Sequence, residues 1–162
     1  MPVPAAIARV AGEYVQNTGC LQKALADLTL EQWLARPSDH SNHITWIVGH
    51  LIWARHALIS RAGGSWSCPG LEPFARSAKL SESASYPAPD ELLKLWSESA
   101  SAVEATLAAL TPEALAAPAP PGPPSPDGKL SGFIGVLAWH ETYHLGQIAY
   151  LRSWLGQSGV FG

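Results

Sequence analysis

Apolar residues recur at intervals of three and four along four long stretches of the chain, a spacing typical of helices with one buried face. No stretch alternates apolar and polar residues as a half-buried strand would. The predicted helices run approximately from Pro4 to Leu28, from Ser41 or Asn42 to Gly63, from Pro89 to Leu110 and from Ser131 to Gly156. Two shorter pieces, Leu30–Ala35 and Thr111–Ala117, are each predicted to add one turn.

Several predicted helix ends carry residues with known end preferences. Ser41 and Asn42 are good N-cap residues, and Gly63 provides a stop. Pro89 suits a first helical turn, and the acidic residues that follow it lie near the positive end of the helix dipole.

Two connections differ from ordinary loops. The segment from Ser65 to Pro89 is longer than most connections, so it either crosses back along the helices or forms a lid. Pro118–Pro126 contains six prolines and is predicted to be a stiff surface linker. Four amphipathic helices with one long connection predict an all-α fold, an antiparallel four-helix bundle with a crossover, in a single domain over residues 1–162.

Composition removes several classes of function. The net charge is −3 and the ten Lys and Arg residues are scattered, so no basic stripe is available for nucleic acid. The most apolar segment, Ile44 to Ile59, is interrupted by His50, Arg55 and His56, so no membrane span is expected. The first residues lack the features of a signal peptide. The two cysteines, Cys20 and Cys68, form no paired motif. We therefore expect a reduced, cytoplasmic protein.

The segment His140-Glu141-Thr142-Tyr143-His144 lies within the last predicted helix. Histidines four residues apart lie on the same helix face, so both rings can reach one metal ion. The segment also matches H-E-x-x-H, the signature of zinc peptidases. Those enzymes take a third ligand from downstream, yet the 18 residues after His144 contain no Asp, Glu, His or Cys. Any third ligand in this chain is expected from residues upstream of the motif, which disfavours the interpretation of the motif as that of a zinc peptidase.

Among the other histidines, His50 stands out as the candidate third ligand. It lies in the middle of the second predicted helix, flanked by Trp46 and Trp53 at positions minus four and plus three. A polar ring among apolar residues needs a partner, because its unpaired burial costs free energy. His43 lies on roughly the same face but nearer the helix start, where a rim position is expected. A single histidine of this kind is more often a packed residue than a ligand.

Two blocks of sequence resemble the DinB-like (damage-inducible) family of metal-binding four-helix bundles. The block Ile44-Thr45-Trp46-Ile47-Val48-Gly49-His50-Leu51 is similar to the family's apolar-Gly-His segment. The ending HETYHLGQIAYLRSWLG, from His140 to Gly156, is similar to its H-x-x-x-H-x-G-Q-I ending. The resemblance implies a metal held by His50, His140 and His144, and a homodimer. The proline-rich segment and the short tail after the last helix depart from the family pattern, and both could alter the entrance to the site.

Three neutral imidazoles leave coordination positions open, as in catalytic zinc sites. We expect Zn²⁺ or Ni²⁺, with Fe²⁺ or Mn²⁺ as alternatives. A bound ion would lower the pKa of a coordinated water or thiol. Family relatives include thiol-dependent transferases and isomerases. The resemblance therefore implies a divalent-metal-dependent transferase using a low-molecular-weight thiol, or a hydrolase, acting on a small-molecule substrate. The alternative is a non-catalytic bundle protein that binds metal or a small ligand.

Other residues near the motif have weaker candidate roles. Glu141 occupies the general-base position of the peptidase motif, although it lies 100° around the helix from His140. Gln147 shares the face of the two motif histidines and could orient a ligand or water. Trp46, Trp53 and Tyr143 could wall the pocket, or simply belong to the core. Cys68 is a conceivable nucleophile for which no neighbouring base can be named.

Overall fold

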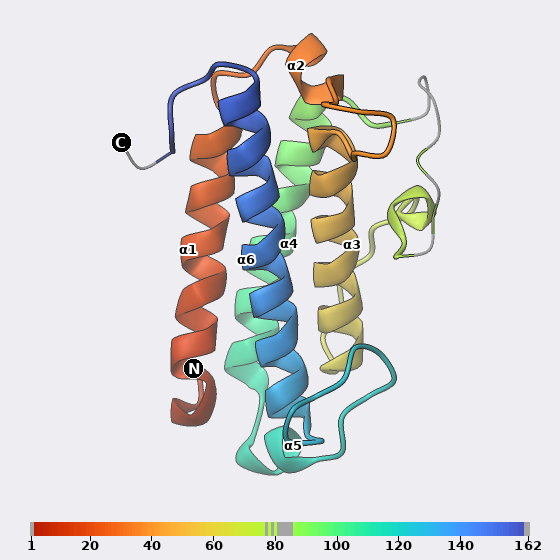
Figure 1. Cartoon of the computed structure of the whole chain (residues 1–162). Coiled ribbons are helices and arrows are strands. Elements are labelled where there is room, and N and C mark those ends of the chain that lie inside the picture. The colour runs from red at the N-terminus through yellow and green to blue at the C-terminus, as the bar shows by residue number, and fades with distance from the viewer. Residues whose placement is uncertain (1, 77, 79, 81–85, 161–162) are drawn as a thin grey trace.

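The computed structural model describes residues 2–76, 78, 80 and 86–160, and these residues form helices without any β-strand. The predicted all-helical class is therefore confirmed for this part of the chain. Four long helices lie side by side (Figure 1): α1 (Ala8–Leu25), α3 (Ile44–Arg61), α4 (Pro89–Ala109) and α6 (Leu130–Trp154). The shorter elements are η1 (Ala5–Ile7), α2 (Leu30–Leu34), η2 (Glu72–Phe74) and α5 (Pro112–Ala116). None of the helices described has the length and apolar content that a bilayer span requires.

The long helices pack in a ring. α3 packs against α4 and α6, and α1 packs against the same two helices. Figure 1 shows that α1 and α6 run in one direction whereas α3 and α4 run in the other. α3 and α4 are therefore parallel neighbours, while the contacts of α3 with α6 and of α1 with α4 are antiparallel. The antiparallel contact of α3 with α6 brings the middle of one helix to the middle of the other.

The segment between α3 and α4 returns the chain along the length of the helices, which agrees with the crossover expected for Ser65–Pro89 (Figure 1). Residues 77, 79 and 81–85 of this segment lie outside the described residues. Its described part includes η2, where Phe74 has no exposed surface and packs into the core beside α3. This buried aromatic residue fixes the segment to α3 next to the candidate site.

The start of α3 differs from the prediction. The helix begins at Ile44, and its N-cap is His43 rather than Ser41 or Asn42. The His43 Nδ1 atom accepts a hydrogen bond of 3.0 Å from the backbone N–H of Trp46, the bond that a Ser or Asn side chain would otherwise accept. Burial lowers the pKa of His43 to about 4, which keeps the ring neutral and able to accept. His43 is thus buried rather than at the rim, because it caps the helix.

The predicted stops at glycine residues agree with the structure. α3 and α6 are followed by Gly63 and Gly156, which have φ values of 81° and 75°. This left-handed conformation costs glycine little, and it lets the backbone N–H groups after each helix bond the last helical carbonyls.

The core has two apolar halves separated by a polar layer. One half is centred on Trp33, Phe74 and Trp96, and the other on Phe133 and Ile134. Between them lie buried polar side chains from all four long helices, at Asn17, Arg55, Ser99, Glu141 and His144. Since apolar side chains pack in almost any register but polar partners do not, this layer can fix how the helices align.

Candidate metal centre

Three histidines meet where α3 and α6 face each other. His50 comes from the middle of α3, and His140 and His144 come from successive turns of α6. One ring nitrogen of each lies within 4.8 Å of the others. The Nε2 atom of His140 is 3.2 Å from that of His50 and 3.0 Å from that of His144. The three residues that the sequence singled out are therefore brought together, in an arrangement that could hold a metal ion.

Hydrogen bonds on the far side of two rings determine where their protons lie. The Nδ1 atom of His50 donates to the backbone carbonyl of Phe74 at 2.7 Å. The Nδ1 atom of His144 donates to the Oε1 atom of Gln147, also at 2.7 Å. Because both partners are oxygen acceptors, each neutral ring carries its proton on Nδ1 and presents an Nε2 lone pair to the cluster. Outer partners of this kind orient histidine ligands in metal sites.

The convergence of these lone pairs favours a cation at their centre. A proton on Nε2 of His140 could be shared between His50 and His144, but the lone pairs of these two residues would still face each other within 4.8 Å. The Nδ1 atom of His140 is buried and has no hydrogen-bond partner among the described residues. A divalent ion accepts all three lone pairs at once.

The protonation states also suit metal binding. Burial, with a smaller contribution from the neighbouring histidines, lowers the pKa of His140 and of His144 to about 4. Burial likewise lowers the pKa of His50, with a smaller contribution from the charge of Arg76. Neutral imidazole is the form that binds metal, so the rings need lose no proton near neutral pH.

Aromatic residues hold the histidine rings in place. The ring of His50 is stacked with the indole of Trp46, at 4.9 Å and 8°, and with that of Trp53, at 5.5 Å and 16°. Tyr143 meets His144 edge-on at 5.3 Å. The Gln147 side chain also donates to the Tyr143 hydroxyl at 3.4 Å, so Tyr143 steadies the residue that orients His144.

The cluster opens on one side into a pocket of about 390 Å³, which we call the histidine pocket. His50, His140, Trp53 and Trp139 are among the residues that line it. The proline-rich segment contributes Gly122, Pro123 and Pro124, so the predicted surface linker also borders the pocket. A cavity of this size accommodates a small organic molecule. A second pocket, of about 370 Å³, lies between α1 and α4 and contains no histidine.

The family model of the DinB superfamily matches residues 13–148, which include all three histidines. The chain belongs to the DinB superfamily. The predicted resemblance is thereby confirmed. A search of the curated proteins found no match to this DinB chain.

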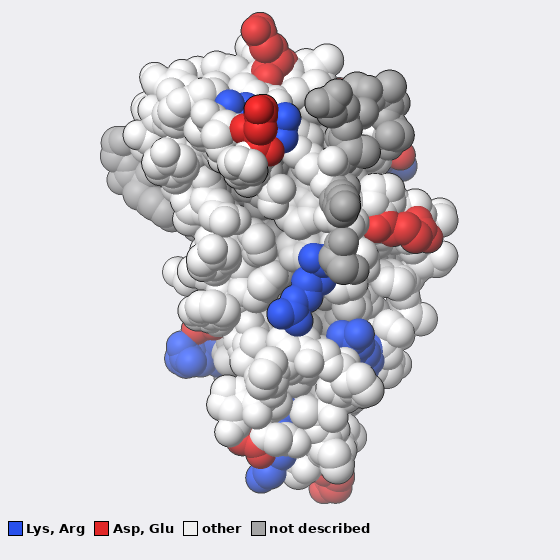
Figure 2. All heavy atoms as spheres, turned by 45° about the vertical axis from the view of Figure 1, so that its right-hand side comes forward, with Lys and Arg blue, Asp and Glu red and all other residues white. Residues whose placement is uncertain are grey.

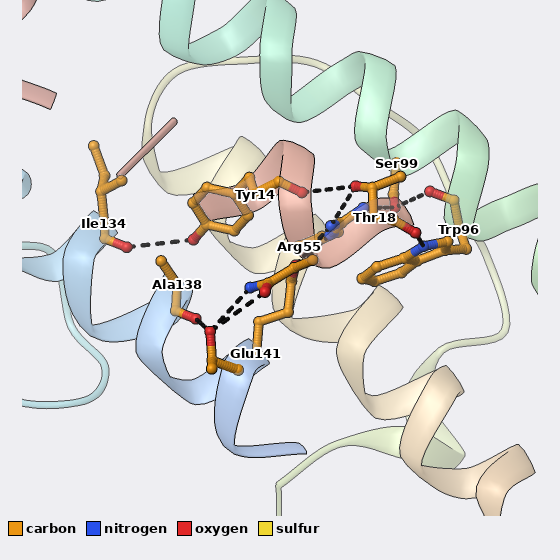
Figure 3. Close-up of polar contacts among 10 residues, drawn as sticks. Tyr14, Thr18, Arg55, Trp96, Ser99, Ile134, Ala138 and Glu141 are labelled. Atoms are coloured by element: carbon orange, nitrogen blue, oxygen red, sulfur yellow. Dashed lines mark hydrogen bonds and ion pairs between the residues drawn. The ribbon is translucent and has the colours of Figure 1, made fainter. Parts of the chain in front are cut away.

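Glu141 is buried in the core and is not among the residues that line the histidine pocket. Both of its carboxylate oxygens accept hydrogen bonds from Arg55, at 2.8 Å from Nε and 2.7 Å from Nη2 (Figure 3). Burial raises the pKa of this carboxyl, while the charge and hydrogen bonds of Arg55 lower it. In this DinB protein the glutamate of the H-E-x-x-H match thus holds an arginine instead of facing the histidine pocket.

The guanidinium of Arg55 connects all four long helices. Besides Glu141 on α6, it donates to Thr18 on α1 at 2.9 Å and to Ser99 on α4 at 3.3 Å (Figure 3). It also lies over the Trp96 ring, 3.3 Å from the ring centre. Sequence reasoning noted Arg55 only as an interruption of an apolar segment. A charged residue in such a segment signals a buried partner, and Glu141 in the other apolar helix matches it.

Gly49 allows η2 to approach α3. A Cβ atom at this position would overlap the ring of Phe74, whose carbonyl accepts the His50 hydrogen bond. The glycine before the histidine in the DinB-like block therefore has a steric reason in this chain.

Gly49→Ala is therefore expected to displace Phe74 and to separate its carbonyl from His50. The unfolding free energy should fall by about 1–3 kcal/mol through overpacking. Loss of the outer hydrogen bond should weaken zinc binding by about 10–100-fold. Chelator competition and urea unfolding measure the two effects.

Gly135→Ala is the matched control, because a Cβ atom at Gly135 on α6 meets nothing within 4 Å. This variant should keep both properties. Unchanged zinc affinity in Gly49→Ala would show that the Phe74 contact does not support His50.

The remaining candidates lie away from the cluster. Cys68 is buried, and burial raises the pKa of its thiol, which disfavours the nucleophilic thiolate. His56 and His40 are half-buried and exposed respectively, and neither belongs to the metal-competent group.

Proposed function

We propose that this DinB protein binds one divalent metal ion through the Nε2 atoms of His50, His140 and His144, and that it is a metal-dependent enzyme acting on a small molecule. The proposed reaction is transfer of an organic group to a low-molecular-weight thiol, or hydrolysis. Zn²⁺ and Ni²⁺ are the ions that we expect, with Fe²⁺ and Mn²⁺ as alternatives.

One observation carries this proposal: three imidazole nitrogens converge beside a pocket that is open on one side. Structural zinc sites are closed by four protein ligands, whereas catalytic sites use three and leave a position for water or substrate. Among the described residues, no other His, Cys, Asp or Glu belongs to the group. The protein therefore supplies three ligands and leaves access from the histidine pocket.

When bound, a divalent ion would supply Lewis acidity, lowering the pKa of water or of a thiol toward neutrality. The chain's own residues prepare the site for it. The carbonyl of Phe74 and the amide of Gln147 set the tautomers of His50 and His144. Trp53 and Trp139 line the pocket with apolar ring surface, against which an apolar acceptor can lie.

The activity test compares zinc-loaded wild type with zinc-treated His50→Ala. Cysteine and 1-chloro-2,4-dinitrobenzene test thiol transfer, in which the thiolate sulfur bonds to the ring carbon and chloride leaves. 4-Nitrophenyl acetate tests hydrolysis, in which hydroxide attacks the carbonyl and 4-nitrophenolate leaves. We expect wild type to exceed the variant by at least about 100-fold in one assay, since metal activation supplies several kcal/mol. Equal rates in both assays, with zinc bound to wild type, would favour a non-catalytic metal-binding protein.

Four finer features extend the same proposal. We take the four long helices to form a four-helix bundle with antiparallel pairs, and residues 1–162 to be one domain. The homodimer and the cytoplasmic location stay predictions.

A further inference from the structure

Two arginines, neither of which has been given a role so far, border the histidine pocket. Arg61 is the last residue of α3, at the opposite end of the helix from its N-cap. Arg76 follows η2 in the crossover segment. Both belong to the pocket lining together with His50 and His140. The site thus combines a metal-competent cluster with two guanidinium groups.

Neither charge is neutralised within the described part of the chain. The ion pairs there involve other cations, and neither Arg61 nor Arg76 takes part in one. Among the described residues, no Asp or Glu lines the pocket. Figure 2, which looks onto the side of the molecule that carries α3, shows basic side chains in the middle of this face and acidic ones toward its ends and edges. Two unpaired guanidinium groups beside a cation site favour an anion.

The proline-rich segment helps to position Arg61. Its Gly122 passes so close that a Cβ atom there would lie 2.8 Å from the ring of Phe133 and 3.0 Å from the Nη1 atom of Arg61. The guanidinium in turn lies 5.8 Å from the centre of the Phe133 ring. Arg61 is therefore packed between an aromatic ring and the segment, while remaining solvent-accessible.

We propose that the histidine pocket binds a small organic carboxylate, whose carboxylate group is held by Arg61 and Arg76 and whose apolar body lies against Trp53 and Trp139. Guanidinium groups match carboxylates in geometry and can donate two hydrogen bonds to one of them. Because the reactive end of this substrate would face the histidines, the inference rests on the proposed metal-dependent function. It gives the crossover and proline-rich segments a common role, which is to complete an anion-binding wall.

The test uses a matched pair of probes, 2-naphthoate and 2-naphthamide, which differ in charge but share an aromatic body. Calorimetric titration measures both with zinc-loaded and with chelator-treated protein. The variants are Arg61→Gln, Arg76→Gln and the double substitution. Lys23→Gln is the control, since Lys23 is an exposed cation on α1 outside the pocket lining.

We expect wild type to bind 2-naphthoate on the order of tenfold more tightly than 2-naphthamide, with and without zinc. The preference should shrink in each arginine variant, vanish in the double variant and persist in Lys23→Gln. Absence of the preference in wild type, or its survival in the double variant, would overturn the proposal. A preference that needs zinc and survives in the double variant would place the anion on the metal, leaving the proposed function intact. A preference without any zinc binding would retain the anion site and reject the proposed function.

Discussion

Replacing Glu141 by alanine is expected to lower the free energy of unfolding by about 3–5 kcal/mol, because it leaves the charge of Arg55 buried without a counterion. Both side chains are almost fully buried, at 1% and 3% exposed. The loss is a large part of the stability of a typical domain. Urea unfolding followed by circular dichroism measures it, and a midpoint equal to that of wild type would show that the pair does not matter to the fold.

The double variant Arg55→Met with Glu141→Leu separates the missing charge from the missing side chain. Removing both charges leaves no unpaired ion, so this protein should be more stable than Glu141→Ala. If the polar layer sets the register of α3 against α6, the double variant should nevertheless bind zinc less tightly than wild type. Equal zinc affinity would show that the apolar core alone aligns the three histidines.

The second large effect is expected at the metal ligands. His144→Ala should lower zinc affinity by more than the roughly 10–100-fold that loss of an outer partner costs. The reason is that only two of the three imidazoles remain, and α6 then offers one ligand instead of two. Competition with a colorimetric chelator measures the affinity.

His56→Ala is the matched control for that experiment. His56 lies on α3, about 1.7 turns beyond His50, and does not belong to the metal-competent group found among the described residues. This variant should bind zinc as wild type does. Equal affinity for zinc in His144→Ala would remove this residue from the ligand set.

The helices and the candidate ligands were accessible from the sequence because both follow from spacing. The apolar period placed the four long helices, and the separation of His140 from His144 placed two rings on one face. His50 was found because a polar ring in an apolar helix needs a partner. The glycine stops after α3 and α6 were also predictable, since a left-handed residue favours glycine.

Other features depend on contacts that spacing does not encode. The partner of His50 is a backbone carbonyl, at Phe74, and any residue type can offer one. His43 caps α3 through a ring nitrogen, a role that a search for Ser or Asn misses. That Arg61 and Arg76 border one pocket depends on where the crossover and proline-rich segments fold back. The prolines and serines of these segments indicate only that no long helix forms there.

The metal centre also illustrates why a short motif needs its surroundings. The letters H-E-x-x-H place two histidines correctly for a metal in both peptidases and this DinB protein. The glutamate of the motif differs between the two sites: in this chain Arg55 holds Glu141 in the core, and Glu141 does not line the pocket. The burial and partner of the glutamate therefore distinguish the two sites, whereas the motif does not.

X-ray absorption at the zinc edge of the zinc-loaded protein tests the central claim most directly. The account predicts one zinc ion per chain, three imidazole nitrogens at about 2.0–2.1 Å, and further oxygen ligands from solvent. Substoichiometric zinc, or a shell completed by sulfur or by a fourth protein ligand, would contradict it.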